Sequence, residues 1–369
     1  MKRIRYGRIA ALVAVSALAL TACGNDPVAS TDPGGGGGDS ESSELSGELA
    51  GAGASSQESA MQAWIAGFGA SNPDVIVSYD PAGSGAGRTQ FGEGAVQFAG
   101  SDSVMDDEER QAAKQACGSD AIHLPLYISP IALIYNLQGV DNLQLSPATV
   151  AGIFDRKITK WNDPKIAADN PGAKLPGTNV TPVNRSDESG TTENFTEYLA
   201  ATAKGAWSYE PSGDWPKKGG QSAQGTSGVV QTVQGGQGTI GYADASQAGQ
   251  LGKAKIKVGE NFVESSADAA AKIVDESQKV TGGPEHDLAY DLKRDTTAEG
   301  TYPIVLVSYL IVCQTYKDAA QGELVKAFVG YIASEEGQKA AASAAGSAPI
   351  SPDLRTEADA AVKSIGAGS

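Results

Sequence analysis

Between residues 47 and 103, short apolar segments alternate with turns rich in Gly and Ser and with helix-forming segments. Residues 47–54, 75–79 and 95–99 are typical of strands, and residues 57–69 and the stretch after Gly87 are typical of helices. This alternation indicates an α/β fold with a mostly parallel sheet. Ligands of such sheets lie at the carboxyl ends of the strands, where the Gly and Ser turns occur.

Two long apolar regions follow, one at residues 122–136 with a proline interruption and one at residues 302–313. Both are typical of buried strands. We interpret them as two crossings between lobes, so that the chain builds one lobe, crosses, builds a second and returns. Helices expected at residues 322–333 and 335–345 would then complete the first lobe.

The first 22 residues have the pattern of a secretion signal, with a basic start and an apolar run from Ile9 to Leu20. That run is too short to span a bilayer comfortably. It ends in Leu-Thr-Ala-Cys, which resembles a bacterial lipobox, so we expect Cys23 to become the lipid-carrying first residue. The alternative is an ordinary signal with a chance cysteine. Residues 23–46 are rich in Gly, Ser, Asp and Pro and are expected to form a flexible tether.

Removal of the signal takes away four basic residues and no acids, so the formal charge goes from −16 to −20. This charge argues against binding to nucleic acid and against a polybasic membrane contact. Roughly 320 residues remain after the tether, enough for two lobes of ordinary size. Outside the cell the remaining cysteines, Cys117 and Cys313, favour a disulfide, although two buried free thiols are the alternative.

The segment from Arg185 to Thr192 carries the clearest chemistry. It places a guanidinium, several hydroxyls and backbone N–H groups just before a helix expected over residues 193–199. A helix start leaves N–H donors free and carries partial positive charge, so an oxyanion can bind there. Asp187 can hold Arg185 in one orientation while the guanidinium faces the anion. The alternative, a plain surface ion pair, would contribute little.

These motifs together resemble the phosphate-binding lipoproteins and periplasmic proteins that feed the high-affinity ABC phosphate transporter, the PstS family. The resemblance covers about residues 47–354, and its anchors keep the family's order and spacing. The anchors are Gly51-Ala52-Gly53-Ala54, Gly83-Ser84-Gly85, Phe98-Ala99-Gly100-Ser101-Asp102, Lys160-Trp161-Asn162-Asp163, Lys174-Leu175-Pro176-Gly177, Arg185 to Thr191, and Gly238-Thr239-Ile240-Gly241-Tyr242.

The resemblance implies a two-lobe periplasmic-binding-protein fold (type II), hinged by two crossover strands, that closes on the anion. Lobe one would comprise residues 47–128 and 303–369, and lobe two residues 129–302. The resemblance also implies a phosphate site drawn from both lobes. Its expected members are Ser55, Ser56, Ser84, Asp102, Arg185, Ser189, Gly190 and Thr191, with Asp187 orienting the arginine.

The chain departs from the family pattern at two places. The family often has Thr-Phe where this chain has Ser55-Ser56, but a serine hydroxyl or any backbone N–H can serve as donor. The family often has Gly where this chain has Glu188. A carboxylate beside an anion should repel it, so Glu188 is left out of the expected site.

Asp102 gives the expected site its selectivity. An ionised carboxylate only accepts hydrogen bonds, so it can take the proton of phosphate, whereas deprotonated sulfate offers none. The alternative role for Asp102 is to cap the helix after Ser103, and Ser84 could likewise cap the helix that it precedes.

We therefore expect a lipid-anchored receptor on the extracytoplasmic face of a bacterial membrane that passes inorganic phosphate to an ABC permease. It should be a monomer and a non-enzyme, with no cofactor and no metal. One rival is a secreted phosphatase or esterase with Ser84 or Ser189 as nucleophile. Against it, the chain has only two histidines and Ser84 lacks the Gly-x-Ser-x-Gly elbow. The other rival is a receptor for another tetrahedral oxyanion, such as sulfate or molybdate.

Overall fold

The computed structural model describes residues 45–367. The predicted signal, Cys23 and nearly all of the predicted tether lie outside the described residues. In the described part, no helix has the length and apolar character needed to cross a membrane. The helices are α1 (Glu58–Ser71), α2 (Ser84–Gly92), α3 (Asp107–Cys117), α4 (Pro147–Phe154), α5 (Pro164–Asp169), α6 (Gly190–Thr202), α7 (Gly225–Gly235), α8 (Ala267–Glu276), α9 (Ala319–Ala333), α10 (Glu335–Ala345) and α11 (Pro352–Ser364).

One nine-stranded sheet organises these helices, in the order β2-β1-β3-β14-β4-β8-β6-β7, with β9 also paired to β4. Its strands are β1 (Gly47–Gly53), β2 (Val75–Asp80), β3 (Phe98–Ser101), β4 (Ala121–Asn136), β6 (Thr181–Arg185), β7 (Gln221–Ala223), β8 (Thr239–Asp244), β9 (Gly252–Lys253) and β14 (Val305–Cys313). The pairs of β1 with β2 and β3, and of β6 with β7 and β8, are parallel. The pairs that involve β14 or β4 are antiparallel, so the prediction of mostly parallel pairing holds for the outer strands only.

The described part of the chain also has one three-stranded sheet and two strand pairs. They are β5 (Gln144–Leu145) with β10 (Lys255–Val258) and β11 (Asn261–Val263), β12 (Gln278–Lys279) with β13 (Tyr290–Asp291), and β15 (Thr315–Tyr316) with β16 (Gly366–Ala367). Each is short, and none of them carries a predicted site residue.

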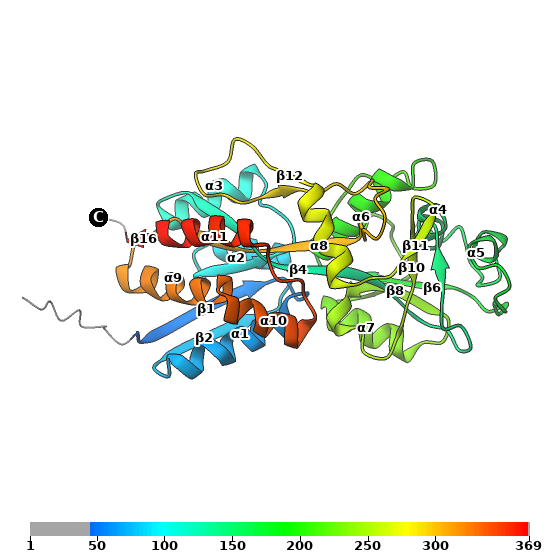
Figure 1. Cartoon of the computed structure of the whole chain (residues 1–369), viewed down its shortest axis with the longest axis horizontal. Coiled ribbons are helices and arrows are strands. Elements are labelled where there is room, and N and C mark those ends of the chain that lie inside the picture. Colours follow the sequence, from blue (N-terminus) through cyan, green and yellow to red (C-terminus); the bar gives the residue numbers. More distant parts are fainter. Residues whose placement is uncertain (1–44, 368–369) are drawn as a thin grey trace, which may run out of the picture. The chain divides into compact units, whose positions relative to one another are not determined.

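Strand β4 is one continuous element, although the sequence predicts two segments separated by proline. Its first part pairs with β14 from Ala121 to Pro130, and its second part pairs with β8 from Ile131 to Asn136. Pro125 lies where the β14 register shifts, and a bulge of this kind accommodates a residue that has no N–H. Figure 1 shows β4 running from one half of the ribbon into the other.

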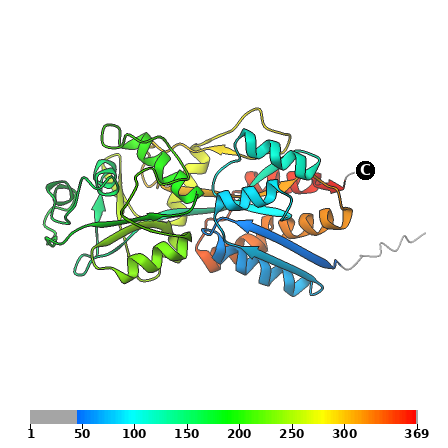
Figure 2. The same ribbon diagram turned by 180° about the vertical axis from the view of Figure 1, so that it is seen from behind.

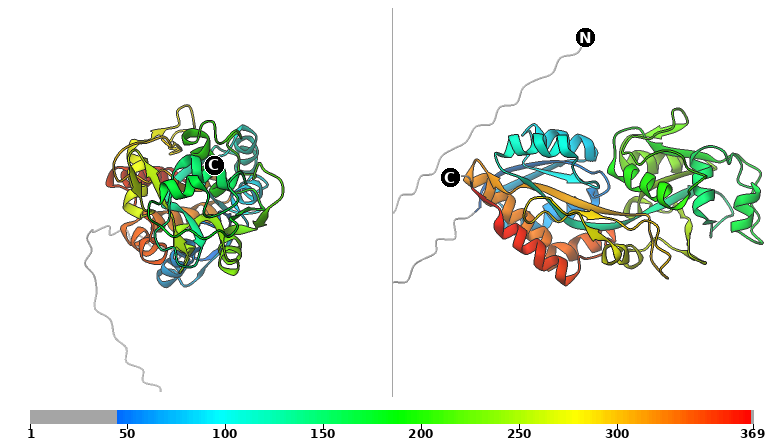
Figure 3. Two further views of the ribbon diagram at one scale, coloured as in Figure 1. Left: turned by 90° about the vertical axis from the view of Figure 1, so that its right-hand side faces the viewer. Right: turned by 90° about the horizontal axis from the view of Figure 1, so that it is seen from above.

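Both ends of the described chain contribute to the same half of the ribbon. The early blue and cyan elements and the late orange and red helices lie together, the green middle of the chain forms most of the other half, and a yellow segment reaches back to lie beside α3 (Figures 1 and 2). Helices α2 and α3 lie on one face of the sheet and α9 to α11 on the other (Figure 3). The core between them buries large side chains such as Trp64, Phe98 and Phe328.

Cys117 and Cys313 form a disulfide, with their Cα atoms 5.6 Å apart, as the sequence predicts. Cys117 ends α3 and Cys313 ends β14, so the bond joins an early helix to a late strand, 196 positions away. The third strand is shifted from its predicted place, since β3 spans Phe98–Ser101 instead of residues 95–99. Residues 94–97 lie before β3 and are not part of a strand. In this segment the Gln97 carbonyl accepts a hydrogen bond from the Tyr316 hydroxyl.

Candidate anion-binding site

Four strand-to-helix turns carry the predicted site or its direct neighbours. Helix α1 follows β1, α2 follows β2, α6 follows β6 and α7 follows β7. Each helix begins near small residues, so its first N–H groups are accessible to a ligand. Helix α6 begins at Gly190, earlier than predicted, because Ser189 caps it by accepting a hydrogen bond from Thr192 N at 3.3 Å. Gly190 and Thr191 therefore belong to the positive first turn of α6.

Asp102 is buried at the centre of this group, directly after β3. The Ser56 hydroxyl donates to both carboxylate oxygens at 2.7 and 2.8 Å, and the Thr191 hydroxyl donates to one of them at 2.9 Å. The Asp102 N–H donates to Ser84 Oγ at 3.2 Å. Four of the predicted residues, from distant parts of the sequence, are thus brought into one hydrogen-bonded cluster.

Gly190 packs against the same cluster, and only glycine fits there. A Cβ atom at this position would lie 2.7 Å from Asp102 Cβ and 2.9 Å from Ser84 Oγ. Any larger residue would force α6 away from the turn that holds Asp102. The glycine allows the first turn of α6 to lie directly against the turn that holds Asp102.

Arg185 ends β6 and pairs with Asp187 through two hydrogen bonds, Nε to Oδ1 at 2.8 Å and Nη2 to Oδ2 at 2.5 Å. The Arg185 side chain is only 2% exposed and that of Asp187 14%, so the alternative of a plain surface ion pair is wrong. Burial by itself raises the pKa of Asp187, but the bonds and charge of Arg185 bring that pKa below its ordinary value. The carboxylate therefore stays ionised and holds the guanidinium in one orientation.

Ser55 lies beside the start of α7, and sequence reasoning missed its partners. Its hydroxyl accepts a hydrogen bond from Thr226 N at 3.0 Å and lies 3.1 Å from Thr226 Oγ1. Its carbonyl accepts from Gln247 Nε2 at 2.8 Å. The stretch Gly225-Thr226-Ser227-Gly228 repeats the small-residue pattern of the other turns, and this signal could have identified Thr226.

Asn194 is a second residue that the sequence reasoning missed. Its amide donates to the carbonyls of Asp102 and Gly190, both at 2.7 Å. Its own carbonyl accepts a hydrogen bond from the buried Arg294 guanidinium. The Asn194 amide therefore has partners on both its nitrogen and its oxygen, and it links the backbone carbonyls of Asp102 and Gly190.

The capping alternatives for Asp102 and Ser84 are wrong. Helix α3 is capped by Asp106, whose side chain accepts from Glu109 N at 2.8 Å in a capping box. Gly83 holds the N-cap position of α2, with a φ of 108°, and Ser84 is the first helical residue. Neither Ser84 nor Asp102 is therefore used as a helix cap.

Neither histidine is placed to activate a serine. His123 is fully buried, with Nδ1 2.7 Å from Asp287 Oδ1 and Nε2 accepting from Met105 N at 3.0 Å. Burial lowers the pKa of His123, so the ring is neutral and both nitrogens are occupied. His286 Nε2 lies 3.8 Å from Glu285, and in residues 45–367 neither ring bonds to Ser84 or Ser189.

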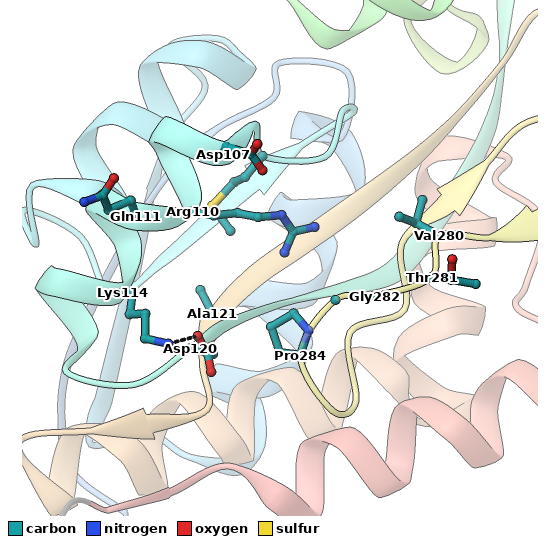
Figure 4. Close-up of a pocket in the computed structure, with 12 residues that line it drawn as sticks. Asp107, Arg110, Gln111, Lys114, Asp120, Ala121, Val280, Thr281, Gly282 and Pro284 are labelled. Carbon is teal, nitrogen blue, oxygen red and sulfur yellow. Dashed lines mark ion pairs between the residues drawn. The ribbon is translucent and has the colours of Figure 1, made fainter.

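Two further features of residues 45–367 lie apart from the cluster around Asp102. Among residues 45–367 no cluster of His, Cys, Asp and Glu could hold a metal ion. A cavity of about 600 Å³ lies between α3 and the loop at residues 280–284 (Figure 4). Its charged lining includes Arg110 and a pair of Lys114 with Asp120 at 2.8 Å, and it contains none of the predicted site residues.

Asp244, at the end of β8, is a buried carboxylate with an incomplete set of partners. Its Oδ1 accepts from Tyr127 OH at 3.1 Å, Ser246 N at 2.9 Å and Ser246 Oγ at 2.5 Å. Its Oδ2 has no hydrogen-bond partner among residues 45–367. Burial raises the pKa of Asp244 to about 6. The ionised group therefore destabilises the fold at neutral pH.

We expect Asp244→Asn to raise the free energy of unfolding at pH 7.5 by roughly 2 kcal/mol, because the amide keeps the Oδ1 acceptor and removes the buried charge. The folded-state pKa of about 6 exceeds the ordinary value of 3.8. The cost is therefore absent below about pH 4, grows as pH rises and is complete above about pH 6. Urea unfolding of both proteins at pH 4, 5.5 and 7.5 measures this difference. A gain that does not depend on pH would contradict the role of the charge.

The fold and site define a class of protein. The sheet has the connectivity of a periplasmic-binding-protein fold. The N-termini of several helices lie near the buried Arg185–Asp187 ion pair and the Asp102 carboxylate. In agreement, the PBP superfamily domain matches residues 38–336. The chain belongs to the PstS family of phosphate-binding proteins.

Two mycobacterial relatives show this membership. Phosphate-binding protein PstS 3 of Mycobacterium tuberculosis is 35% identical over 343 residues, which is 89% of this chain and 90% of that protein. Phosphate-binding protein PstS 2 of the same species is 37% identical over 340 residues, with the same coverage.

Solved structures agree on the fold. A high-affinity periplasmic phosphate-binding protein (PfluDING), bound with phosphate, matches with a TM-score of 0.69 at 22% identity, over 85% of this chain and 93% of that one. The phosphate-binding protein from Stenotrophomonas maltophilia gives a TM-score of 0.66 at 20% identity, over 85% and 94%.

Proposed function

We propose that this protein is an extracytoplasmic, lipid-anchored receptor that binds inorganic phosphate between two lobes and delivers it to an ABC import permease. Family membership and the donor-rich cluster around Asp102 support the binding role. The lipid anchor at Cys23 rests on the lipobox pattern of the sequence. The protein would hold its ligand without turnover, since neither histidine contacts a candidate nucleophile among residues 45–367.

The proposed lobes are residues 47–128 with 303–369, and residues 129–302. In support, β4 pairs with β14 before Ile131 and with β8 from Ile131 onward, so β4 and β14 are natural crossover strands. Hydrogen bonds from Thr191 and Asn194 to Asp102 join the two proposed lobes. Donors from both sides of one site favour lobe closure around the ligand.

The proposed ligands are of three kinds. The N-terminal turns of α2 and α6 would supply N–H groups, Arg185 would supply charge, and hydroxyls would complete the set. The residues proposed to contact phosphate are Ser55, Ser56, Ser84, Asp102, Arg185, Ser189, Gly190 and Thr191, with Asp187 orienting Arg185. Thr226 would support Ser55.

One observation carries the proposal: Asp102 is an acceptor at the centre of a site otherwise made of donors. Monohydrogen and dihydrogen phosphate bring a proton that this carboxylate can accept. Sulfate has no proton at neutral pH, so its oxygen would face a carboxylate oxygen with no hydrogen bond between the two. An unpaired polar group in a desolvated site costs about 1–3 kcal/mol, and more when it is charged. The site therefore favours phosphate over sulfate.

The test is isothermal titration of the protein from Ser46 onward, stripped of ligand, with phosphate and with sulfate. We expect one phosphate per chain and no sulfate heat. Asp102→Asn should weaken phosphate binding about 10- to 100-fold, because its amide cannot accept at both positions, and should reduce the discrimination against sulfate.

Asp107→Asn is the matched control, since Asp107 is an exposed acid in the first turn of α3, outside the site. It should bind phosphate as the wild type does. Folded, ligand-free protein that gives no phosphate heat would refute the receptor proposal. Binding of sulfate or molybdate instead would support the rival oxyanion receptor.

A further inference from the structure

Glu188, which the sequence reasoning left out of the site, has a specific partner. Its Oε1 lies 3.2 Å from Nη2 of Arg88, one turn into α2. Arg88 lies in the proposed lobe one and Glu188 in the proposed lobe two. The carboxylate that should repel an anion is therefore turned toward a cation on the opposite side of the proposed cleft.

Two glycines make room for the Glu188 side chain. A Cβ atom on Gly85 would lie 1.5 Å from Glu188 Oε2, and one on Gly213 would lie 2.2 Å from Oε1. The carboxylate thus lies in a slot between α2 and the segment whose Gly213 carbonyl accepts from Ser189 N at 3.1 Å. This packing distinguishes Glu188 from a loose surface acid, although its side chain is 32% exposed.

Contacts other than the one to Glu188 also fix the Arg88 side chain. Its side chain is 7% exposed, its Nε donates to Glu109 at 2.8 Å and its Nη1 donates to Ser101 Oγ at 3.0 Å. Burial by itself lowers the pKa of Arg88, but Glu188 and Glu109 together raise it above the ordinary value. The guanidinium stays charged, and its Nη2 bonds across to Glu188.

The two ends of this ion pair adjoin the proposed binding residues. Arg88 lies one helical turn after Ser84, and Glu188 directly precedes Ser189. We infer that Glu188 is a positioning residue, whose bond to Arg88 holds the first turn of α6 against α2 in the closed form and so slows phosphate release. This inference rests on the proposed function. It assigns Glu188 an effect on the lifetime of the complex, without direct contact to the ligand.

The test is stopped-flow measurement of phosphate association and release by the wild type and by Glu188→Gln. Glutamine keeps the volume between the glycines and removes the charge. We expect release to become about 5-fold faster, as for a partly exposed ion pair, while the association rate changes less than 2-fold. Release from the wild type should also speed up with added KCl, and that of the variant should respond less.

Glu109→Gln is the matched control, because Glu109 also pairs with Arg88 but lies in the same proposed lobe. It should leave the release rate within 2-fold of the wild type. The thermal midpoint of ligand-free Glu188→Gln should equal that of the wild type, because the inference assigns the bond an effect on the phosphate-bound, closed form alone.

Three results would overturn the inference while leaving the receptor proposal intact. The first is a phosphate release rate of Glu188→Gln equal to that of the wild type. The second is a release rate of Glu109→Gln that rises as much as that of Glu188→Gln. The third is a thermal midpoint of ligand-free Glu188→Gln below that of the wild type. Absence of phosphate binding by the wild type itself would instead refute the receptor proposal, and the role of Glu188 would fall with it.

Discussion

Replacing Arg185 with alanine is expected to weaken phosphate binding about 1,000-fold, the largest loss from any single site residue. Hydrogen bonds to charged groups contribute about 1.5–3 kcal/mol each, and a guanidinium can direct two of them at one anion. The substitution also leaves Asp187 without its cationic partner beside the anion, although Gly225 N still donates to it. A carboxylate that has lost its counter-charge in a partly buried site repels phosphate and adds to the loss.

Titration calorimetry of Arg185→Ala with phosphate measures this effect. Arg185→Lys should recover only part of the affinity, because an ammonium lacks the planar fork that binds Asp187 and an anion together. The control is Arg355→Ala, on α11 outside the site. Phosphate binding by Arg185→Ala within 10-fold of the wild type would contradict the position proposed for the guanidinium.

Removing the disulfide is expected to lower the free energy of unfolding by about 4 kcal/mol. The bond closes a loop with a sequence separation of 196 residues. Loops of this length gain roughly 5 kcal/mol in the chain-entropy model, and measured gains commonly fall below that value. The bond joins α3 to β14, which are brought together only in the folded chain.

Urea unfolding of the double variant Cys117→Ala, Cys313→Ala measures the loss at equilibrium. Wild-type protein whose disulfide has been reduced with dithiothreitol should show the same loss, which separates the effect of the bond from the effect of the substitutions. Phosphate stoichiometry should stay at one per chain in both, because neither cysteine belongs to the proposed site. A decrease of less than 1 kcal/mol would mean that the unfolded state is already compact or that the bond stores strain.

The local sequence determined which segments form the strands, the turns after them and the helices that follow. Strand propensity, glycine and serine at strand ends, and helix-forming segments after them are short-range properties, so the start of α1 at Glu58 was predictable within one residue. The start of α2 was predicted wrongly, because the helix begins at Ser84, inside the stretch interpreted as a turn, and not after Gly87. The pair Arg185 and Asp187 was predictable for the same reason, since its members are two positions apart. The cysteine pair followed from the number of cysteines and the expected compartment.

Only the tertiary structure decided which turns meet. Thr226 contacts Ser55 across 171 positions, and Asn194 contacts Asp102 across 92. No periodicity or spacing encodes such pairs, because they depend on strand order and on the antiparallel β4 and β14 at the middle of the sheet. Likewise, the sequence alone predicted that the Glu188 carboxylate would repel a bound anion. The fold turns its carboxylate toward Arg88, 100 positions earlier, because two glycines leave space for the side chain there.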